Sequence, residues 1–424
     1  MIKIYDTFEQ AMKETQMIAE ESTADIDAVV RTIIEEVRTR KDEALYDYSE
    51  KFDGIRPKEL HVPTEEIEQA MKAVPADFIT TLHMAKENIE SYHKRQKREN
   101  YIINEKEGVI LGQRIIPLEK VGIYVPGGTA SYPSSVLMNA LPAKIAGVSD
   151  IVMVTPCGKD GKVSDVILAA AKIAGVTKIF KVGGAQAIAA LAYGTESIPK
   201  VDKITGPGNI YVATAKKMVY GLVDIDMMAG PSDILVIADE SANYRFVAAD
   251  MLGQAEHDEI ASAVLVTDSK NLAEKVRDEI ELQLNMLERA DIARASISNN
   301  GKIIIVKDMD EAVFVCNEIA PEHLEICTAD PFALLNKVKN AGSVFLGENA
   351  PEALGDYFAG TNHVLPTSGT ARFASPLGVD DFIKKSSFMY YTKEALKDVK
   401  DRIIDFAEKE GLGAHAESIR IRFR

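Results

Sequence analysis

Short apolar strands that alternate with alanine-rich helical stretches constrain the fold of this chain most strongly. The first series places strand patterns at 121–125, 151–154 and 178–182, with helical patterns near 134–147 and 163–175 between them. Strands that are separated by helices pair in parallel through right-handed crossovers. The series therefore predicts a parallel α/β sheet.

A second series repeats this rhythm further along the chain. Its strand patterns lie at 234–237, 263–266, 303–306, 324–327 and 343–346. Two α/β units in tandem are the simplest interpretation.

The first hundred residues are predicted to be helical. Apolar side chains recur there at three- and four-residue steps, at Ile26, Val29, Val30, Ile33, Ile34 and Val37, and a second helical run follows Pro75. His83 and His93 lie in that second run among charged residues, so we interpret them as solvated surface histidines. The tail is predicted to be helical from 394 to 410 and to end in a basic, strand-like segment, as an appendage without its own core.

Length and charge narrow the class of protein. A chain of 424 residues is too long for one simple core, so two or more domains are expected. The 49 Lys and Arg against 65 Asp and Glu, without a basic run, argue against nucleic-acid binding. Three distant cysteines without a CxxC pair favour a reducing cytoplasm. Neither a signal peptide nor an apolar run of membrane-spanning length is expected.

Three glycine clusters follow predicted strands, at 124–129, 183–186 and 206–209. The carboxyl edge of a parallel sheet is where ligands bind, and glycine lets the backbone approach a phosphate closely. Ordinary turns use glycine in the same way. Tyr211 stands where a dinucleotide fingerprint would have its third glycine, so the standard motif is absent.

Four of the seven histidines lie near acidic residues, as His257, His323, His363 and His415. Gln254 and His257 share one face of a predicted helix, which suits either two ligands of a metal ion or a buried structural pair. The pattern by itself would choose Glu256 rather than Gln254 as the oxygen donor.

Two possible nucleophiles have simpler interpretations. Ser232 is not in a Gly-x-Ser-x-Gly turn, so we expect its hydroxyl to contact a substrate or cap a turn. Cys157 has no evident base beside it, so we interpret it as an unreactive loop thiol rather than as a group that attacks an aldehyde.

Over essentially its whole length the sequence resembles the histidinol dehydrogenases. The matching stretches are 121–129, 183–188, 201–209, 230–232, 254–257, 320–324, 355–356, 361–367 and 411–415. Asp233 and Glu259 depart from the residues that are commoner in the family, but neither is one of its functional positions.

The resemblance implies two tandem incomplete Rossmann-like domains with parallel sheets, plus small helical terminal segments that intertwine in a homodimer. Residues 1–24 would form the N-terminal segment, and 25–120 with 235–375 the domain that carries the zinc and catalytic residues. Residues 121–234 would form the NAD side, and 376–424 a tail that reaches the partner subunit.

The same resemblance assigns roles to individual residues. It implies zinc ligands at Gln254, His257, Asp356 and His415, a catalytic pair at Glu322 and His323, and NAD contacts at Tyr124, Gln186 and Asn209. Ser232, His363 and Glu410 match substrate contacts, as do His323 and the four zinc ligands. Glu410 and His415 would come from the partner subunit.

The activity implied is the zinc- and NAD-dependent oxidation of L-histidinol to L-histidine through bound L-histidinaldehyde, the last steps of histidine biosynthesis, in the cytoplasm. Two hydrides must leave, so two NAD molecules are used in succession. His323 suits the removal of the alcohol proton, and Glu322 the activation of water. Adjacent residues do not share a helix face, so we expect this pair on a loop or at the start of a strand after Pro321.

Three other functions fit the sequence less well. A related zinc and NAD dehydrogenase of another small polar alcohol would have little use for Glu410 and His415. A zinc hydrolase would leave the glycine clusters unexplained. A binding or scaffold protein is favoured least, because buried pairs of acid and imidazole are costly without a use.

Overall fold

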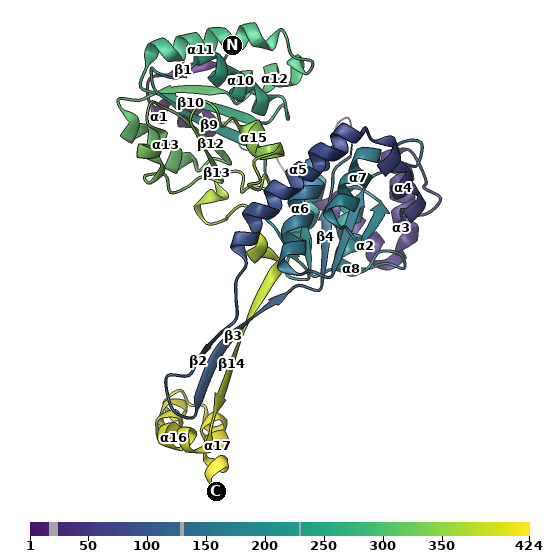
Figure 1. Ribbon diagram of the computed structural model, residues 1–424, viewed down its shortest axis with the longest axis vertical. Helices are drawn as coiled ribbons and strands as arrows, with labels where there is room; N and C mark the ends of the chain where they lie inside the picture. Colours follow the sequence, from purple (N-terminus) through teal and green to yellow (C-terminus); the bar gives the residue numbers. More distant parts are fainter. Residues whose placement is uncertain (17–23, 128–130, 229) are drawn as a thin grey trace. The chain divides into compact units, whose positions relative to one another are not determined.

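The computed structural model describes residues 1–16, 24–127, 131–228 and 230–424. These residues form two units, one of 1–96 with 118–382 and the other of 97–117 with 383–424 (Figure 1). Three parts of the chain that the sequence analysis used, or that directly precede such a part, lie outside the described residues: 17–23 of the expected N-terminal segment, Gly128 and Thr129 of the first glycine cluster, and Ala229 directly before the stretch 230–232. The domain boundaries expected from the sequence stay a prediction.

The larger unit contains a six-stranded parallel sheet in the order β1-β11-β10-β9-β12-β13. Its strands are β1 (Lys3–Tyr5), β9 (Asp233–Ala238), β10 (Ser262–Thr267), β11 (Lys302–Ile305), β12 (His323–Cys327) and β13 (Ser343–Leu346). Its helices are α1 (Phe8–Gln16), α10 (Tyr244–Ala255), α11 (Lys270–Leu284), α12 (Ala290–Asn299), α13 (Met309–Ile319) and α14 (Pro331–Leu335). One face packs on α10, α11 and α12, and the other on α1 and α13. This confirms the second predicted series of strands.

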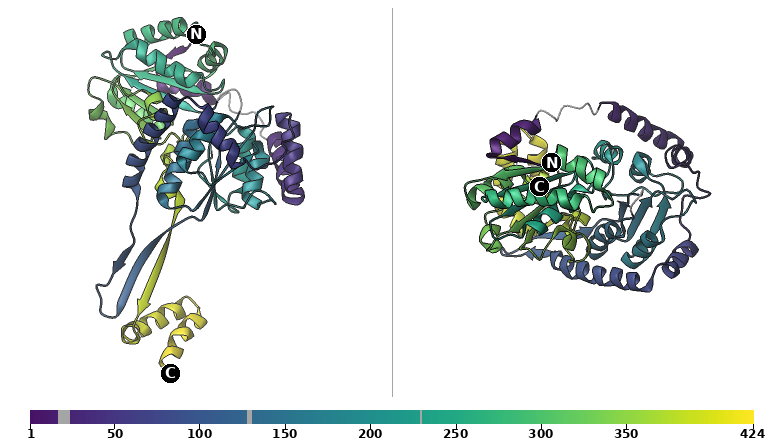
Figure 2. Two further views of the ribbon diagram at one scale, coloured as in Figure 1. Left: turned by 45° about the vertical axis from the view of Figure 1, so that its right-hand side comes forward. Right: turned by 90° about the horizontal axis from the view of Figure 1, so that it is seen from above.

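The larger unit also contains a five-stranded parallel sheet in the order β6-β5-β4-β7-β8. Its strands are β4 (Lys120–Tyr124), β5 (Asp150–Thr155), β6 (Lys178–Lys181), β7 (Lys203–Thr205) and β8 (Asp224–Ile225). Helices lie on both sides of this sheet (Figure 2). Helices α6 (Pro133–Ala146) and α7 (Asp165–Ala174) cover one face, and α8 (Gly184–Tyr193) and α9 (Ile210–Val219) cover the other. The strand order reverses between β4 and β7, and such a switch point is where open α/β sheets bind ligands.

Four further helices, α2 (Ala24–Arg40), α3 (Asp42–Asp53), α4 (Thr64–Ala73) and α5 (Ala76–His93), add to these two layers. The first two pack into the core beneath α8 and α9, and the last two into the core beneath α6 and α7. The predicted helical stripe is confirmed at Val30, Ile33, Ile34 and Val37, which are buried.

One histidine of this helical region differs from expectation. His83 is exposed, as predicted, but His93 is completely buried, and its Nδ1 lies 2.8 Å from Gln96 Oε1. The prediction of a surface position for His93 was wrong because Leu82, Ala85, Ile89 and His93 follow one another at three- and four-residue steps. They form the inward stripe of α5, and the lysines around His93 occupy its other faces.

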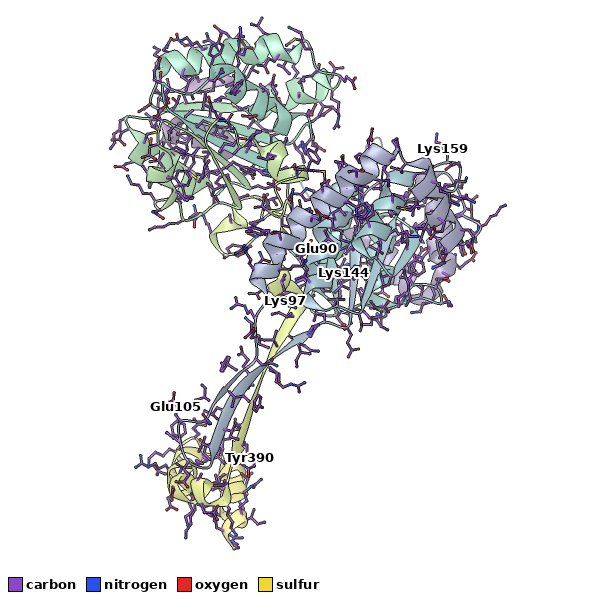
Figure 3. All side chains as sticks on the ribbon, viewed as in Figure 1. Glu90, Lys97, Glu105, Lys144, Lys159 and Tyr390 are labelled. Atoms are coloured by element: carbon purple, nitrogen blue, oxygen red, sulfur yellow. The ribbon has the colours of Figure 1, made fainter. Side chains whose placement is uncertain are left out.

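The smaller unit is a three-stranded antiparallel sheet followed by helices. Strands β14 (Ile383–Tyr391), β3 (Val109–Pro117) and β2 (Tyr101–Ile103) pair in that order, and β14 and β3 pair along nine residues each. Helix α16 (Lys393–Lys409) confirms the predicted tail helix. Among the described residues of this unit, the buried apolar side chains are Ala407 and Ala416, which agrees with an appendage that lacks a core. Tyr390, labelled in Figure 3, is 58% exposed on β14.

The strand-like chain end predicted from the sequence is wrong. Residues Gly413–Arg420 form α17, followed by a 3-10 turn at Ile421–Phe423. Glu417 forms ion pairs with Arg420 at 3.9 Å and with Arg424 at 2.7 Å, so the basic residues lie at helical spacing from one acid.

The α/β class with two parallel sheets is thus confirmed, together with a small antiparallel sheet that was not expected. Within the described part of the chain, no helix is long and apolar enough to cross a membrane.

Candidate functional site

A buried pair of residues lies at the amino-terminal ends of β9 and β12. His323 begins β12 beside β9, and Glu322 directly precedes it; the two are 4% and 5% exposed. Glu322 N–H donates to Asp233 Oδ1 at 2.9 Å, and Asp233 N–H donates to Glu322 Oε2 at 3.1 Å. This reciprocal pair fixes the turn after Pro321. The expectation that Glu322 and His323 lie at the start of a strand is confirmed.

The orientation of the His323 ring follows from its hydrogen bond. Nδ1 lies 3.2 Å from the Asp233 carbonyl oxygen, which can only accept, so Nδ1 is the donor. Nε2 is buried and has no hydrogen-bond partner. Neutral His323 therefore presents the lone pair of Nε2, as a general base must.

Three carboxyl groups surround this imidazole. Nδ1 lies 3.9 Å from Glu322 Oε2 and 3.7 Å from Glu352 Oε1, while Nε2 lies 3.8 Å from Asp356 Oδ1. Burial alone would lower the pKa of His323, but the charges of Glu352, Glu322 and Asp356 outweigh it and raise that pKa well above its ordinary value, so the ring must release a proton before it can act as a base. Burial raises the pKa of Glu322 to about 8 and that of Glu352 to about 7. The cluster can therefore hold and release protons near neutral pH.

Helix α15 (Glu352–Tyr357) brings two of these carboxyl groups to His257. Ligand atoms of His257, Glu352 and Asp356 lie within 4.8 Å of one another. Burial lowers the pKa of His257, which keeps its imidazole neutral, as ligation requires. Burial would raise the pKa of Asp356, but His323, His363 and His257 outweigh it, so the Asp356 pKa is lowered and the carboxylate stays ionised.

Three more of the predicted residues lie in α10, after α15 and before β9. Gln254 is in the last turn of α10, just before His257, and is completely buried, yet neither of its amide atoms has a hydrogen-bond partner. His363 Nδ1 donates to the Asp356 carbonyl oxygen at 3.0 Å. Ser232 is half-buried and directly precedes β9.

Glu352 was missed by the sequence prediction. Glu352 and Asp356 are four residues apart and so share a face of α15, the same spacing argument that had paired Gln254 with His257. The signal was therefore present in the sequence.

Glu410 and His415 belong to the smaller unit. There they line a pocket of about 420 Å³ together with apolar side chains that include Phe406 and Leu412.

A larger cavity, of about 970 Å³, opens at the carboxyl edge of the five-stranded sheet. The structure brings all three predicted NAD contacts to its wall, namely Tyr124 after β4, Gln186 in α8 and Asn209 at the start of α9. Tyr124 Oη accepts the Gly184 N–H at 3.1 Å, and Asn209 Oδ1 accepts the N–H groups of Tyr211 and Val212 at 3.1 and 3.2 Å. Cys157 lines the same cavity, and burial raises the pKa of its thiol, which agrees with an unreactive group.

Behind the cluster, Glu325 connects β12 to α15. Its side chain is 1% exposed, and its Oε1 accepts the Glu352 N–H at 2.8 Å. Burial, and next the Asp250 carboxyl group that is hydrogen-bonded to it, raise the pKa of Glu325 to about 9. Glu325 therefore holds a proton at neutral pH while it anchors the first residue of α15.

Glu325→Gln should stabilise the protein increasingly as the pH rises from 5 to 8. An unfolded glutamate titrates near about 4.3, whereas folded Glu325 titrates at about 9. Between these values folding must take up a proton, so this group lowers the stability as pH rises, and glutamine needs no proton. We expect the advantage to grow by several kcal/mol between pH 5 and pH 8, because each pH unit between these two pKa values corresponds to about 1.4 kcal/mol. Thermal unfolding across the pH range measures it.

Glu325→Ala is the control for this prediction. It also needs no proton, but it loses the acceptor of the Glu352 N–H, so it should be less stable than Glu325→Gln at every pH. A glutamine variant whose stability differs from the parent by the same amount at all pH values would contradict the raised pKa.

Comparisons with known proteins agree with one another. The family model described as histidinol dehydrogenase matches residues 16–423. The histidinol dehydrogenase of Clostridium acetobutylicum is 56% identical over 415 residues, which cover 98% of this chain and 96% of that protein. That of Bacillus cereus is 57% identical over 423 residues, covering 99% and 98%. The crystal structure of histidinol dehydrogenase from Elizabethkingia anophelis superposes with a TM-score of 0.94 at 38% identity, covering 100% of this chain and 98% of that one.

Proposed function

Because the chain belongs to the histidinol dehydrogenase family, we propose that its buried cluster oxidises L-histidinol to L-histidine in two successive steps that use zinc and NAD. Membership makes the protein an oxidoreductase of histidine biosynthesis. The observation that carries the two-step proposal is the buried Nε2 of His323, which has no hydrogen-bond partner, on a ring whose Nδ1 lies 3.9 Å from Glu322 Oε2. A candidate general base, His323, and a second residue that can exchange protons, Glu322, are therefore adjacent.

The donor set fits a zinc ion. His257 and Asp356 converge, and Gln254 has a buried amide group without any partner, which is costly unless something else binds it. We assign these three residues and His415 as the zinc ligands. Zinc would supply a fixed electrophilic point that holds the imidazole and amine nitrogens of the substrate. Glu352 lies close enough to contribute a carboxylate oxygen.

The large cavity fits NAD. Its volume of about 970 Å³ and its position at the switch point of the sheet suit a dinucleotide. NAD would accept one hydride in each oxidation. Tyr124, Gln186 and Asn209 would bind it, with Gln186 Oε1 buried and free to accept a hydrogen bond.

The protein residues would handle the protons. His323 Nε2 takes the alcohol proton as the first hydride leaves, and the surrounding carboxyl groups stabilise the imidazolium. The ionised form of Glu322, which its pKa of about 8 makes a minor form at neutral pH and the main form above pH 8, then accepts a proton from the water that hydrates the aldehyde. The hydrate gives up the second hydride.

The proposal includes a shared site in a homodimer. Ser232, His363 and Glu410 would contact the substrate, with Glu410 and His415 supplied by the partner subunit. Apolar side chains of the smaller unit are exposed, among them Met389, Tyr390 and Phe406. This exposure supports the proposal that a second copy of the chain covers them. The cytoplasmic location stays a prediction.

A single assay tests the reaction. Purified protein with histidinol and NAD should form histidine with two NADH per histidine, followed by NADH absorbance and amino-acid analysis. Turnover of another small alcohol but not of histidinol would favour the related dehydrogenase. Hydrolysis without NADH would favour the zinc hydrolase.

Dialysis against a chelator should lower activity by at least about tenfold, because separated side chains release zinc once another ligand competes. Added zinc should restore it. A sample dialysed without chelator is the control, and the metal content of each sample is measured. Full activity in a sample shown to be metal-free would end the zinc assignment.

A further inference from the structure

A fully buried ion pair lies beside the larger cavity without lining it. Lys216 of α9 pairs with Asp226, which follows β8, and their side chains are 2% and 1% exposed. Neither belongs to the cavity wall. Burying two charges costs more than their attraction returns unless both make further hydrogen bonds. The partners of these bonds therefore indicate what the pair does.

Both side chains of the ion pair form hydrogen bonds with the backbone of Gly206. Lys216 Nζ donates to the Gly206 carbonyl oxygen at 3.0 Å, and Asp226 Oδ2 accepts the Gly206 N–H at 2.8 Å. The other carboxylate oxygen, Asp226 Oδ1, accepts the Met227 N–H at 2.7 Å. The ion pair thus binds both polar backbone groups of one glycine.

Gly206 in turn lies between two parts of the cavity wall. Its φ is +116°, and a Cβ on it would lie 2.1 Å from the Tyr124 carbonyl oxygen, so the two backbones are in direct contact. Three residues further on, Asn209 caps α9. Tyr124 and Asn209 both line the cavity. The position of Gly206 therefore sets how these two residues stand relative to each other.

We infer that Lys216 and Asp226 are positioning residues for NAD, which act by holding Gly206 between Tyr124 and Asn209. This inference rests on the proposed binding of NAD in the cavity. It goes further in assigning a role to two residues that touch neither cofactor nor substrate.

A buried lysine in the sheet that α9 covers provides a comparison. Lys203 of β7 is 5% exposed and pairs at 3.0 Å with Asp224, which is 52% exposed, and at 3.6 Å with Asp381, which is 33% exposed. It does not line the cavity either. If buried ion pairs here only stabilise the fold, disrupting either pair should have the same consequences.

The test is the double variant Lys216→Met/Asp226→Leu, which removes both charges together and so leaves no unpaired charge buried. NADH is titrated by its fluorescence, and the KM values for NAD and histidinol are measured. The Kd for NADH and the KM for NAD should both rise about tenfold, and the KM for histidinol should change by less than about twofold. Lys203→Met/Asp224→Leu should lower the Tm and leave the Kd for NADH unchanged.

An unchanged Kd for NADH in the Lys216/Asp226 variant overturns the inference, as does an equal rise in the Lys203/Asp224 variant. If the first variant does not fold, Lys216→Met/Asp226→Asn keeps an acceptor for the Gly206 N–H and should raise the Kd about threefold; no rise there also overturns it. Failure of the parent protein to bind NADH would instead remove the proposed cofactor.

Discussion

His323→Asn should slow the oxidation of histidinol about a thousandfold, whereas Glu322→Gln should chiefly slow the oxidation of supplied histidinaldehyde. Asparagine retains a hydrogen-bond donor but no base at the position of Nε2, so the alcohol proton has no acceptor. Glutamine cannot accept a proton from water, which only the second step requires. Each half-reaction is measured separately as NADH formation from histidinol or from histidinaldehyde.

His93→Asn is the control for these variants. It replaces another buried histidine of the larger unit, whose Nδ1 contacts Gln96 rather than the catalytic cluster. It should lower the stability and leave both half-reactions near the parent rate. If both catalytic variants lose the two half-reactions equally, the division of roles between His323 and Glu322 is wrong.

Mixing two inactive variants should restore about a quarter of the parent activity. His415→Ala lacks a proposed zinc ligand, and His323→Ala lacks the base. If His415 reaches the partner subunit, one site of each mixed dimer combines intact His323 with intact His415, and the other site collects both defects. Random pairing makes half of the dimers mixed, with one good site in two. Activity is measured after the two variants are dissociated and reassembled together.

The control for this experiment mixes His323→Ala with Glu322→Ala. Both lesions lie in the larger unit of the same chain, so half of the sites in a mixed dimer carry one lesion, half carry the other, and activity should not return. No recovery with His415→Ala, in a mixture shown to contain mixed dimers, would place His415 in the site of its own subunit.

Most of the strands that the sequence predicted are buried on both faces. β5, β9 and β10 are nearly continuous apolar runs because helices cover both sides of their sheets. The sequence did not predict β14 and β3. Most of their residues are exposed or half-buried, so their apolar residues follow no regular pattern that would indicate paired strands. β7, with three residues, is too short to give a pattern.

Helices α2 to α5 show a second limit of prediction from sequence, which concerns the sheet that each helix covers. Their apolar stripes predicted helix and a buried face, but a stripe does not say which of two sheets it covers. That choice depends on contacts between residues far apart in the chain, such as those of Ile89 in α5 with the core around β4.

The site was predicted from the family resemblance rather than from the pattern of residues. Spacing and charge would have chosen Glu256 as the oxygen donor next to His257. Gln254 is completely buried and Glu256 only half-buried, because the inner face of α10 accepts a neutral amide at lower cost than a carboxylate. Convergence of α10, α15 and the start of β12 on one point is a tertiary property that no local pattern contains.

The contact between Gly206 and Tyr124 also restricts which mutations the gene can accept at codon 206. Every amino acid that a single nucleotide change can make from a glycine codon carries a Cβ, and at 206 that atom would meet a main-chain oxygen that cannot turn aside. Gly221 also has a positive φ, of +96°, but nothing lies within 4 Å of a Cβ there. An asparagine, two nucleotide changes away, fits at 221 with modest strain, whereas at 206 any replacement brings a Cβ against the Tyr124 carbonyl oxygen.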